Sequence, residues 1–329
     1  MAFYGIRFDL RNPEFAGTDM SERYRAAIEM SEWADRLGFM MVVLSEHHGS
    51  ADGYLPKAMP LASAIAARTK NIRIRIGSII APFYDPLHLA EEAAVVDRIS
   101  DGRLDLVIAN GYVPSEFDMF GVPMSERAAR TTEMITTLKQ AWTGEPFEFR
   151  GRTVTVTPTP QQSWEQMLIL GGGVQAAAKR AAKHELAFMP TDEGAWEFYR
   201  EEVQALGRPD PGPYMGGDVS FFHLAEDVEV GWKEIAPYAM HEMNAYGAWM
   251  DQAGASGGRG TGYSTTPSEE DLRATGQYRV FTPNQFVELN AAKGPAAYVL
   301  CHPLMGGIPP ETGWRSLRLL EKEVMPRLP

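Results

Sequence analysis

Three polar residues, Glu46, His47 and His48, come soon after an apolar run that extends from Phe39 to Leu44, with Ser45 between them. The run is typical of a buried strand, and burying an imidazole or a carboxylate without a partner is costly. We therefore expect these side chains to lie at the mouth of the strand and to face a cavity. An imidazole that titrates near neutral pH can transfer protons there. The structural alternative is that the two histidines cap a core and hydrogen-bond to the backbone.

A second group that could do chemistry is the glycine turn Gly171 to Gly173. An apolar strand that ends at Leu170 leads through this turn and Val174 into an alanine-rich segment. Glycine lets the backbone approach a ligand closely, and the N–H groups at a helix start can hold an anion. The turn has neither the Lys and Ser or Thr of a nucleotide-binding P-loop nor the spacing of a dinucleotide fingerprint. It predicts a site for a phosphate-bearing cofactor, with a turn packed only for steric reasons as the alternative.

Composition narrows the class of protein. The chain has 329 residues, of which 44% are hydrophobic and 22% charged, an ordinary profile for a soluble globular protein. The net charge of -12 argues against nucleic-acid binding as the main role. Cys301 is the only cysteine, which excludes a disulfide framework and a multi-thiolate metal centre, and we expect it to be buried in a strand. With no long apolar window and no leader before the first strand, we expect a cytoplasmic protein that does not associate with membranes.

The elements that position these residues alternate between short apolar strands and amphipathic helices. The expected strands are Phe3 to Asp9, Met40 to Leu44, Ile72 to Ile80, Arg103 to Ala109, Met167 to Leu170, Leu186 to Met189, Val219 to Leu224 and Ala296 to His302. The expected helices are Ser21 to Leu37, Pro56 to Thr69, Pro86 to Ile99, Ser125 to Trp142, Gln175 to His184, Gly194 to Leu206 and Trp314 to Val324.

About eight such strands separated by helices favour an α/β fold, the (β/α)8 TIM barrel with insertions, over an open doubly wound sheet. We expect one domain over residues 1–329, with an exposed hairpin inserted at about 146–157. Catalytic groups of such barrels come from the carboxyl ends of the strands. The candidates at those ends are Asp9, Glu46, His47, Ser78 to Ala81, Asn110 to Tyr112, Gly171 to Val174 and His302.

The region at about 240–280 holds the glycine-rich stretch Gly254 to Gly262, which is flanked by aromatic residues such as Trp249 and Tyr263. Flexible glycines beside aromatic side chains suit a lid that closes over a substrate and excludes water. A disordered surface loop is the alternative.

An ordered series of short segments matches one known family. The segments are Leu44 to His48, Ile76 to Ile80, Asp85 to Glu92, Asp97 to Arg103, Asn110 to Tyr112, Glu116 with Phe117, Phe120 to Pro123, Trp142 to Gly144, Leu170 to Gly172 and Pro303 to Gly307. Together they resemble the bacterial luciferase-like flavin-dependent monooxygenases, through most of residues 1–200 and a C-terminal stretch. The resemblance implies a luciferase-like (β/α)8 barrel with an insertion, a homodimer, and a flavin or deazaflavin bound at the strand ends.

The resemblance also implies roles for the polar residues after the second strand. His47 is the implied catalytic acid or base, which assists the formation or breakdown of a flavin peroxide. Glu46 would orient or polarise the neighbouring histidine and approach the flavin ring, while His48 would be structural. By contrast, Ser100 to Arg103 would be a structural turn in which Arg103 pairs with a carboxylate.

The other implied cofactor-binding residues come from three strand ends. Ser78, Ile79 and Ile80 would lie under the flavin ring, with a non-proline cis peptide at Ser78–Ile79 or Ile79–Ile80. The phosphate would meet Gly172, Gly173 and Val174, with Asn110 reaching toward it, and Tyr112 belongs to the same set. Luciferase itself has a basic residue at the Asn110 position, so we expect a weaker grip that depends on backbone donors. That suits reduced flavin used as a diffusing cosubstrate.

The activity implied by the resemblance is that of a monooxygenase which uses reduced FMN and molecular oxygen to oxidise a small organic substrate. A separate NAD(P)H-dependent flavin reductase would supply the reduced FMN. Two alternatives on the same fold are a deazaflavin-dependent hydride-transfer oxidoreductase and a non-catalytic flavin-binding protein. A metal-dependent hydrolase with His47 and His48 as ligands is a further alternative, but the other ligands it needs are not evident. We predict no metal, because His223, His241 and His302 show no ligand spacing.

Overall fold

The computed structural model describes residues 3–214, 221–254, 262–292 and 298–328. Its main sheet has seven parallel strands in the order β11-β1-β2-β3-β4-β7-β8. Their bounds are β1 Phe3–Phe8, β2 Met41–Leu44, β3 Arg73–Ile80, β4 Leu104–Ala109, β7 Leu168–Gly172, β8 Ala187–Pro190 and β11 Tyr298–Cys301. Strands β9 (Phe221–Leu224) and β10 (Tyr278–Phe281) form a separate parallel pair, in which β9 contacts β11.

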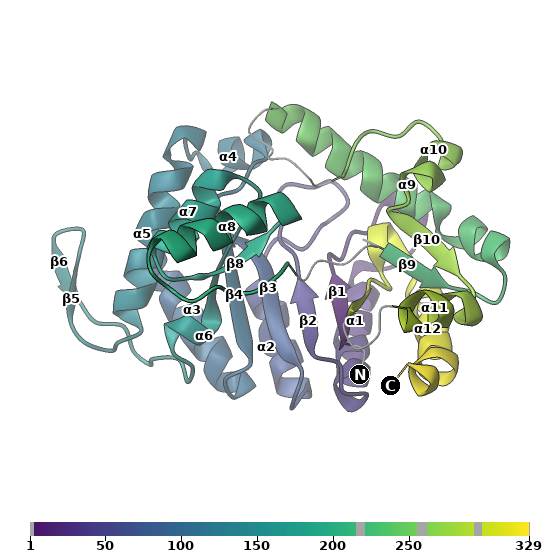
Figure 1. The fold of residues 1–329 in the computed structure, drawn as a ribbon, viewed down its shortest axis with the longest axis horizontal. Coiled ribbons are helices and arrows are strands. Elements are labelled where there is room, and N and C mark those ends of the chain that lie inside the picture. Colours follow the sequence, from purple (N-terminus) through teal and green to yellow (C-terminus); the bar gives the residue numbers. More distant parts are fainter. Residues whose placement is uncertain (1–2, 215–220, 255–261, 293–297, 329) are drawn as a thin grey trace.

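Helices cover this curled sheet (Figure 1). They are α1 Met20–Arg36, α2 Ala58–Arg68, α3 Pro86–Ser100, α4 Pro114–Phe120, α5 Arg127–Ala141, α6 Trp164–Met167, α7 Gln175–Lys183, α8 Glu193–Ala205, α9 Val228–Ala253, α10 Glu269–Thr275, α11 Pro283–Ala291 and α12 Pro310–Leu319. In Figure 1, β1 and β2 point upward, and α4 and α9 lie beyond the carboxyl ends of these strands. The predicted TIM-barrel-like fold is confirmed.

The sheet has an apolar face against the helices and a polar inner face. On β3, the side chains of Ile74 and Ile76 are fully buried, whereas Arg73 and Arg75 alternate with them and are partly exposed. Side chains that alternate along a strand point to opposite faces. The two arginines bind Asp105 on β4, and Arg75 Nη2 lies 2.9 Å from Asp105 Oδ2. The inner face can therefore carry charged groups, and this is the face that leads to the cavity described below.

The predicted hairpin is present as the antiparallel pair β5 (Phe147–Phe149) and β6 (Arg152–Val154). It projects from the body of the fold at the left of Figure 1. Arg150 and Gly151 at its tip both have positive φ, which fits a tight two-residue turn. Cys301 is buried on β11, as the sequence predicts.

Arg103 differs from the prediction, because its hydrogen-bond partners are not carboxylates. The side chain is buried and donates to the carbonyl oxygens of Ala66, Thr69, Ile72 and Ser100. The last carbonyls of a helix have no partner within the helix. Arg103 supplies donors to the end of α2, so the turn is structural, as expected, but through backbone acceptors.

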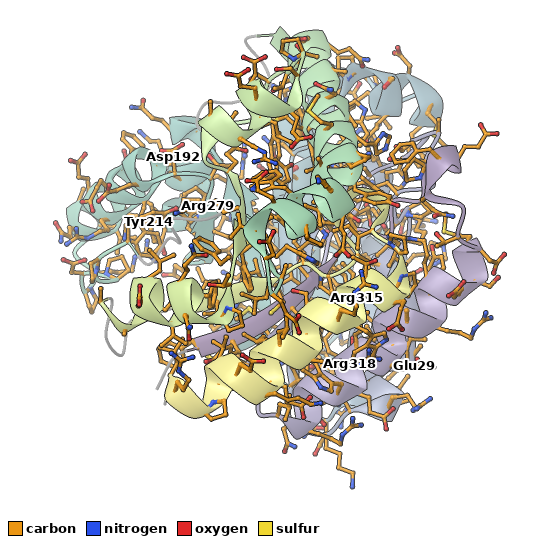
Figure 2. The ribbon with its side chains drawn as sticks, turned by 90° about the vertical axis from the view of Figure 1, so that its right-hand side faces the viewer. Glu29, Asp192, Tyr214, Arg279, Arg315 and Arg318 are labelled. Atoms are coloured by element: carbon orange, nitrogen blue, oxygen red, sulfur yellow. The ribbon has the colours of Figure 1, made fainter. Side chains whose placement is uncertain are left out.

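Helices α1 and α12 lie side by side on one flank of the fold (Figure 2), where Glu29 of α1 and Arg315 and Arg318 of α12 are labelled. The buried Arg23 of α1 ties this flank together. Its guanidinium donates to the carbonyl oxygens of Leu304, Gly307 and Ile308, the loop that leads into α12, at 2.7–3.1 Å.

The predicted lid remains a prediction. Residues 240–253 belong to α9, and most of the stretch Gly254 to Gly262 lies outside the described residues. No helix in the described part of the chain combines the length and apolar character needed to cross a bilayer.

Candidate active site

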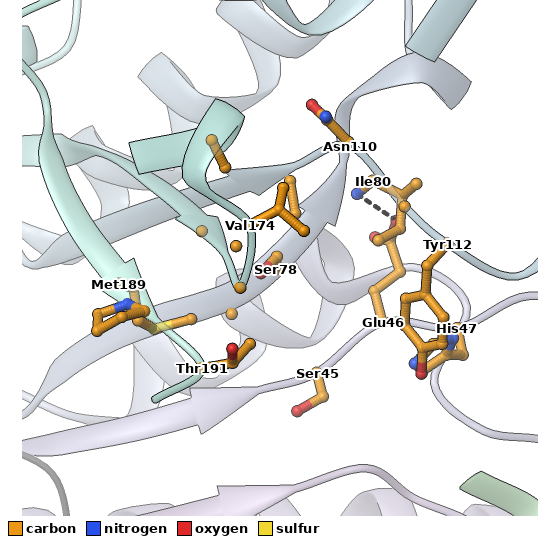
Figure 3. A pocket seen from close by; sticks show the side chains of 18 of the residues that line it. Ser45, Glu46, His47, Ser78, Ile80, Asn110, Tyr112, Val174, Met189 and Thr191 are labelled. Carbon is orange, nitrogen blue, oxygen red and sulfur yellow. Dashed lines mark hydrogen bonds between the residues drawn. The ribbon is translucent and has the colours of Figure 1, made fainter. Parts of the chain in front are cut away.

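A cavity of about 280 Å³ opens at the carboxyl ends of the main-sheet strands. Residues from β1, β3, β7 and β8 and from the loops after β2 and β4 line it. The lining includes, among the predicted site residues, Glu46, His47, Ser78, Ile80, Asn110, Tyr112, Gly172, Gly173 and Val174. In Figure 3, His47 and Tyr112 lie together at one side, Val174 and Met189 at the other, and Ser78 between them.

His47 is held by a carboxylate that the sequence reading did not assign to the site, Glu116 of α4. His47 Nδ1 lies 2.8 Å from Glu116 Oε1, and the backbone N–H of His48 donates to the same oxygen at 2.8 Å. A carboxylate only accepts hydrogen bonds, so the neutral imidazole donates its Nδ1–H. This leaves Nε2 as the nitrogen that can accept a proton, on a residue that lines the cavity.

Aromatic rings fix the plane of the His47 imidazole. Trp249 of α9 stacks on it with a centroid distance of 4.2 Å. Tyr54, Tyr112 and Tyr246 contact it edge-on at centroid distances of 5.0–5.8 Å. With Glu116 on Nδ1 and rings around it, the imidazole has one defined orientation at the cavity wall.

Glu46 binds His48, not His47. Its Oε1 lies 3.1 Å from His48 Nε2 and accepts the backbone N–H of Ile80 at 3.3 Å, while its Oε2 accepts the Tyr84 hydroxyl at 2.6 Å. Burial raises the pKa of Tyr84, and the adjacent Glu46 carboxylate adds to that rise. We expected Glu46 to orient the catalytic histidine. In the structure it joins the ends of β2 and β3, and Glu116 takes the orienting position.

The cis peptide lies one bond earlier than expected, at Gly77–Ser78. The pairing of β3 with β4 shifts register between Gly77 and Ile79 at the same place. Ser78 and Ile80 line the cavity, whereas the side chain of Ile79 is fully buried in the core and does not. Ile79 therefore contributes to packing, because the strand alternation turns it away from the cavity.

The glycine turn brings the start of α7 close to the end of β7. A Cβ on Gly172 would lie 2.7 Å from the Cβ of Ala177, so only glycine allows this approach. Val174 is the N-cap residue of α7 and is exposed. The first N–H groups of a helix lack partners within the helix and attract anions. The turn thus presents backbone donors to the cavity.

Two arginines are associated with the cavity. Arg127 of α5 lines the cavity itself. Arg180 of α7 donates to Asn110 Oδ1 at 3.3 Å, and burial lowers the pKa of this guanidinium. The expectation that an anion would depend more on backbone donors stays a prediction, but these arginines add cationic groups that it did not include. The cationic groups come from helices α5 and α7. The sequence around Asn110 does not show which helices pack there.

Two other strand-end candidates, Asp9 and His302, meet each other outside the cavity lining. His302 Nε2 lies 3.4 Å from Asp9 Oδ2, and His302 Nδ1 lies 4.0 Å from a carboxylate oxygen of Glu242. Burial alone would raise the pKa of Asp9, but His302 and Arg11 hold it down, at about 2, whereas burial raises the pKa of Glu242. In the described residues this trio is the one group with a metal-like arrangement of His and carboxylates, and it lies outside the cavity lining.

Comparison with known proteins places the chain in a family. A sequence model of the luciferase-like monooxygenases matches residues 7–299. The oxygenase component of the flavin-dependent trigonelline monooxygenase of Acinetobacter baylyi is 34% identical over 146 residues, which are 42% of this chain and 40% of that protein. The FMNH(2)-dependent dimethylsulfone monooxygenase of Pseudomonas putida is 24% identical, with 74% and 71% of the two chains covered.

The match to the Acinetobacter protein spans about two fifths of that relative's length. A relative with another cofactor, the F420-dependent glucose-6-phosphate dehydrogenase of Amycolatopsis mediterranei, is 26% identical over 54% of this chain and 57% of its own. Among solved structures, monooxygenase RslO1 from Streptomyces bottropensis shares the fold with a TM-score of 0.73 at 23% identity, over 98% of this chain and 99% of that one. Because the family model covers most of the sequence, the chain belongs to the luciferase-like monooxygenase family.

Proposed function

We propose that the protein is the oxygenase of a flavin-dependent monooxygenase system, which uses reduced FMN and molecular oxygen to oxidise a small organic substrate. The observation that carries this proposal is the pairing of His47 with Glu116 at the wall of a cavity that the glycine turn Gly171 to Gly173 also lines. A proton-transfer group and a phosphate site in one cavity are what such a reaction needs.

The residues fit FMN. The donor set at Gly172, Gly173 and Arg127 suits a phosphate, since it combines backbone N–H groups, a helix start and a guanidinium. Val174 and Asn110 line the same cavity. Between it and His47, the cavity is lined by Ser78, Ile80, Glu46 and Tyr112, which would flank a flat ring system. We propose these residues as the cofactor-binding set.

Reduced flavin, when bound, supplies the electrons that activate dioxygen. The chain contributes the proton transfers and the environment. His47 accepts or donates a proton at Nε2, because Glu116 keeps Nδ1 protonated. Trp249 and Tyr54 pack on the imidazole and reduce the access of water to it. His48, Glu46 and Tyr84 fix the loop that carries His47 against β3.

Two partners belong to the same proposal. The Acinetobacter relative is named as an oxygenase component, which supports a separate NAD(P)H-dependent flavin reductase for this chain as well. We also propose a homodimer. Val95 and Ile99 of α3 are nearly half exposed, and Val95 lines a hollow together with Met59 and Pro60 of α2. Such apolar groups on adjacent helices suit a contact between two copies of the chain.

A deazaflavin-dependent hydride transfer is the second candidate, and the F420-dependent relative favours it. A non-catalytic flavin-binding role fits less well, because an oriented imidazole with a buried carboxylate partner has no purpose in mere binding. The two enzymatic readings differ first in the cofactor that the cavity accepts.

The test is an anaerobic titration of the purified protein with reduced FMN and, in parallel, with reduced deazaflavin, followed by fluorescence and calorimetry. We expect saturable binding of FMN in a 1:1 ratio, weakened about tenfold or more in Arg127→Met, which removes a charged phosphate contact. Arg152→Met, on the remote hairpin, is the control. Binding of the deazaflavin without binding of FMN would contradict the monooxygenase proposal and support deazaflavin-dependent hydride transfer.

A further inference from the structure

A guanidinium lies in the cavity wall away from the phosphate site. Arg7 of β1 lines the same cavity as His47, but β2, β3 and β4 separate it from the glycine turn on β7. With strands about 4.8 Å apart, four strand spacings are roughly 19 Å along the curved sheet. Arg7 therefore lies in a different part of the cavity from a group that is bound at the glycine turn.

The hydrogen-bond partners of Arg7 are hydroxyl groups. Its Nε donates to Ser45 Oγ at 3.2 Å and its Nη2 to the Tyr246 hydroxyl at 3.1 Å. No carboxylate among the described residues lies within 4.0 Å of it. The guanidinium has five N–H donors and is always charged. It is thus a partly buried cation in a cavity with only neutral direct partners.

The carboxylates nearby are already engaged, so they do not neutralise Arg7 directly. The other buried arginine of this region, Arg11, shows the contrast, because its Nη1 forms an ion pair of 2.5 Å. The engaged pairs are Asp52 with Arg11 and His241, Asp9 with Arg11 and His302, and Glu242 with His302 and Tyr278.

The surroundings of Arg7 suit a planar aromatic body. Tyr54, Tyr112 and Tyr246 line the cavity, and the Tyr54 and Tyr246 hydroxyls lie 2.8 Å apart. Tyr246 connects the cation to the proton-transfer group, since its hydroxyl binds Arg7 and its ring centroid lies 5.8 Å from that of His47. A ligand held by Arg7 therefore lies beside His47.

We propose that Arg7 binds the carboxylate of the substrate and that the substrate is a planar aromatic carboxylic acid. An arginine fork matches a carboxylate with two parallel hydrogen bonds, and aromatic walls favour a flat apolar ring. This inference deepens the proposed function and rests on it, because the anion at Arg7 is the oxidised molecule only if the flavin occupies the other side.

The test compares two isosteric probes, benzoate and benzamide, by calorimetry on the protein with and without oxidised FMN. Wild type should bind benzoate about tenfold or more tightly than benzamide, as expected for a charge-assisted pair. Arg7→Met should lose this preference and Arg7→Lys should keep part of it, since lysine keeps the charge without the fork. Arg75→Met, which removes a strand arginine that pairs with Asp105 outside the cavity lining, should keep it.

Equal or absent binding of the two probes to wild type would overturn the inference, and this comparison does not depend on the folding of a variant. Retention of the preference in folded Arg7→Met would overturn it as well. Competition between benzoate and FMN would place the benzoate at the glycine turn, and this would also overturn the inference. If the preference for benzoate depends on Arg7 but the protein does not bind FMN, the anion site at Arg7 is supported and the proposed function is contradicted.

Discussion

At the scale of single residues, His47 is the side chain that we propose for proton transfer, and Glu116 holds its ring. Both are nearly buried, and Glu116 Oε1 serves the His47 ring and the His48 backbone together. His47 could be identified from the sequence, because it follows an apolar strand. Glu116 could not, because it lies 69 positions away and only the fold brings it to the ring.

Replacing Glu116 should impair proton transfer more than cofactor binding. We expect Glu116→Ala to lower the turnover number about 100-fold, since a misplaced acid or base loses most of its effect, while FMN affinity changes less than about threefold. Glu116→Gln keeps a hydrogen-bond acceptor and should lose less. Steady-state kinetics and FMN titration check both. Parallel loss of FMN affinity and turnover would mean that Glu116 serves the cofactor instead.

His223 on β9 should govern stability in mildly acidic solution. Burial lowers its pKa to about 4, and the positive charge of Arg315 adds to the effect. The unfolded chain binds the proton near pH 6.5, so the free energy of unfolding should fall, by on the order of 3 kcal/mol, as the pH drops from 6.5 to 4. Urea unfolding of wild type and His223→Gln over this range gives the difference. A difference that does not vary with pH would show that burial of the neutral imidazole is not the cause.

At the scale of elements, the strands that end in the site could be predicted from the sequence. Elements of the C-terminal part of the chain were harder to predict. The alternation of β3 and the apolar run of β2 stand out in the sequence because burial on one face imposes a period of two. The strand β10 was not predicted, since its residues Tyr278 and Val280 pack in a separate cluster with Ile308. The cis bond was expected at Ser78–Ile79 or Ile79–Ile80 but lies at Gly77–Ser78, and Ile79 is buried in the core, because a register shift cannot be read from composition.

The approach of α7 to β7 depends on Gly172. In Gly172→Ala, the new Cβ would meet Ala177 at 2.7 Å and push the helix start away from the strand. We expect the free energy of unfolding to fall by about 1–3 kcal/mol, as for an overpacked core. FMN affinity should fall about tenfold or more, because the helix start moves away from the phosphate. Denaturation and FMN titration measure the two effects.

The matched control for Gly172 is Gly194→Ala on α8, where a Cβ would meet a side-chain oxygen of Asp192 at 3.2 Å. This change should leave FMN affinity unaltered. A normal FMN affinity in Gly172→Ala would show that the glycine turn does not bind the cofactor.

At the scale of the whole molecule, the ends of the chain are joined by Arg23. Its guanidinium binds three carbonyl oxygens of the loop after β11, more than 280 positions away in sequence. The barrel fold could be predicted from the alternation of strands and helices. The hydrogen bonds of Arg23 could not, because a charged residue in an amphipathic helix is expected to be exposed. The buried ion pairs that surround Asp9 and Arg11 escaped prediction for the same reason.

Removing Arg23 should destabilise the fold without changing its chemistry. Arg23→Met leaves the carbonyls of Leu304, Gly307 and Ile308 buried without donors, at a cost of about 3 kcal/mol or more. Arg25→Met, an exposed arginine on the same helix, should cost less than about 0.5 kcal/mol. Thermal and urea unfolding compare the two variants. Equal stabilities would contradict the role of Arg23 in holding the loop after β11 against α1.

The most direct test of the proposed function is the reaction of the protein–reduced FMN complex with oxygen, followed by rapid mixing and flavin absorbance. If the protein is a monooxygenase with His47 as its proton-transfer group, reoxidation of bound FMN should proceed in distinct phases that differ from free FMN, and His47→Ala should change the rate of the later phase by about 100-fold. Reoxidation identical to that of free FMN in wild type, or identical kinetics in wild type and His47→Ala, would contradict the proposal.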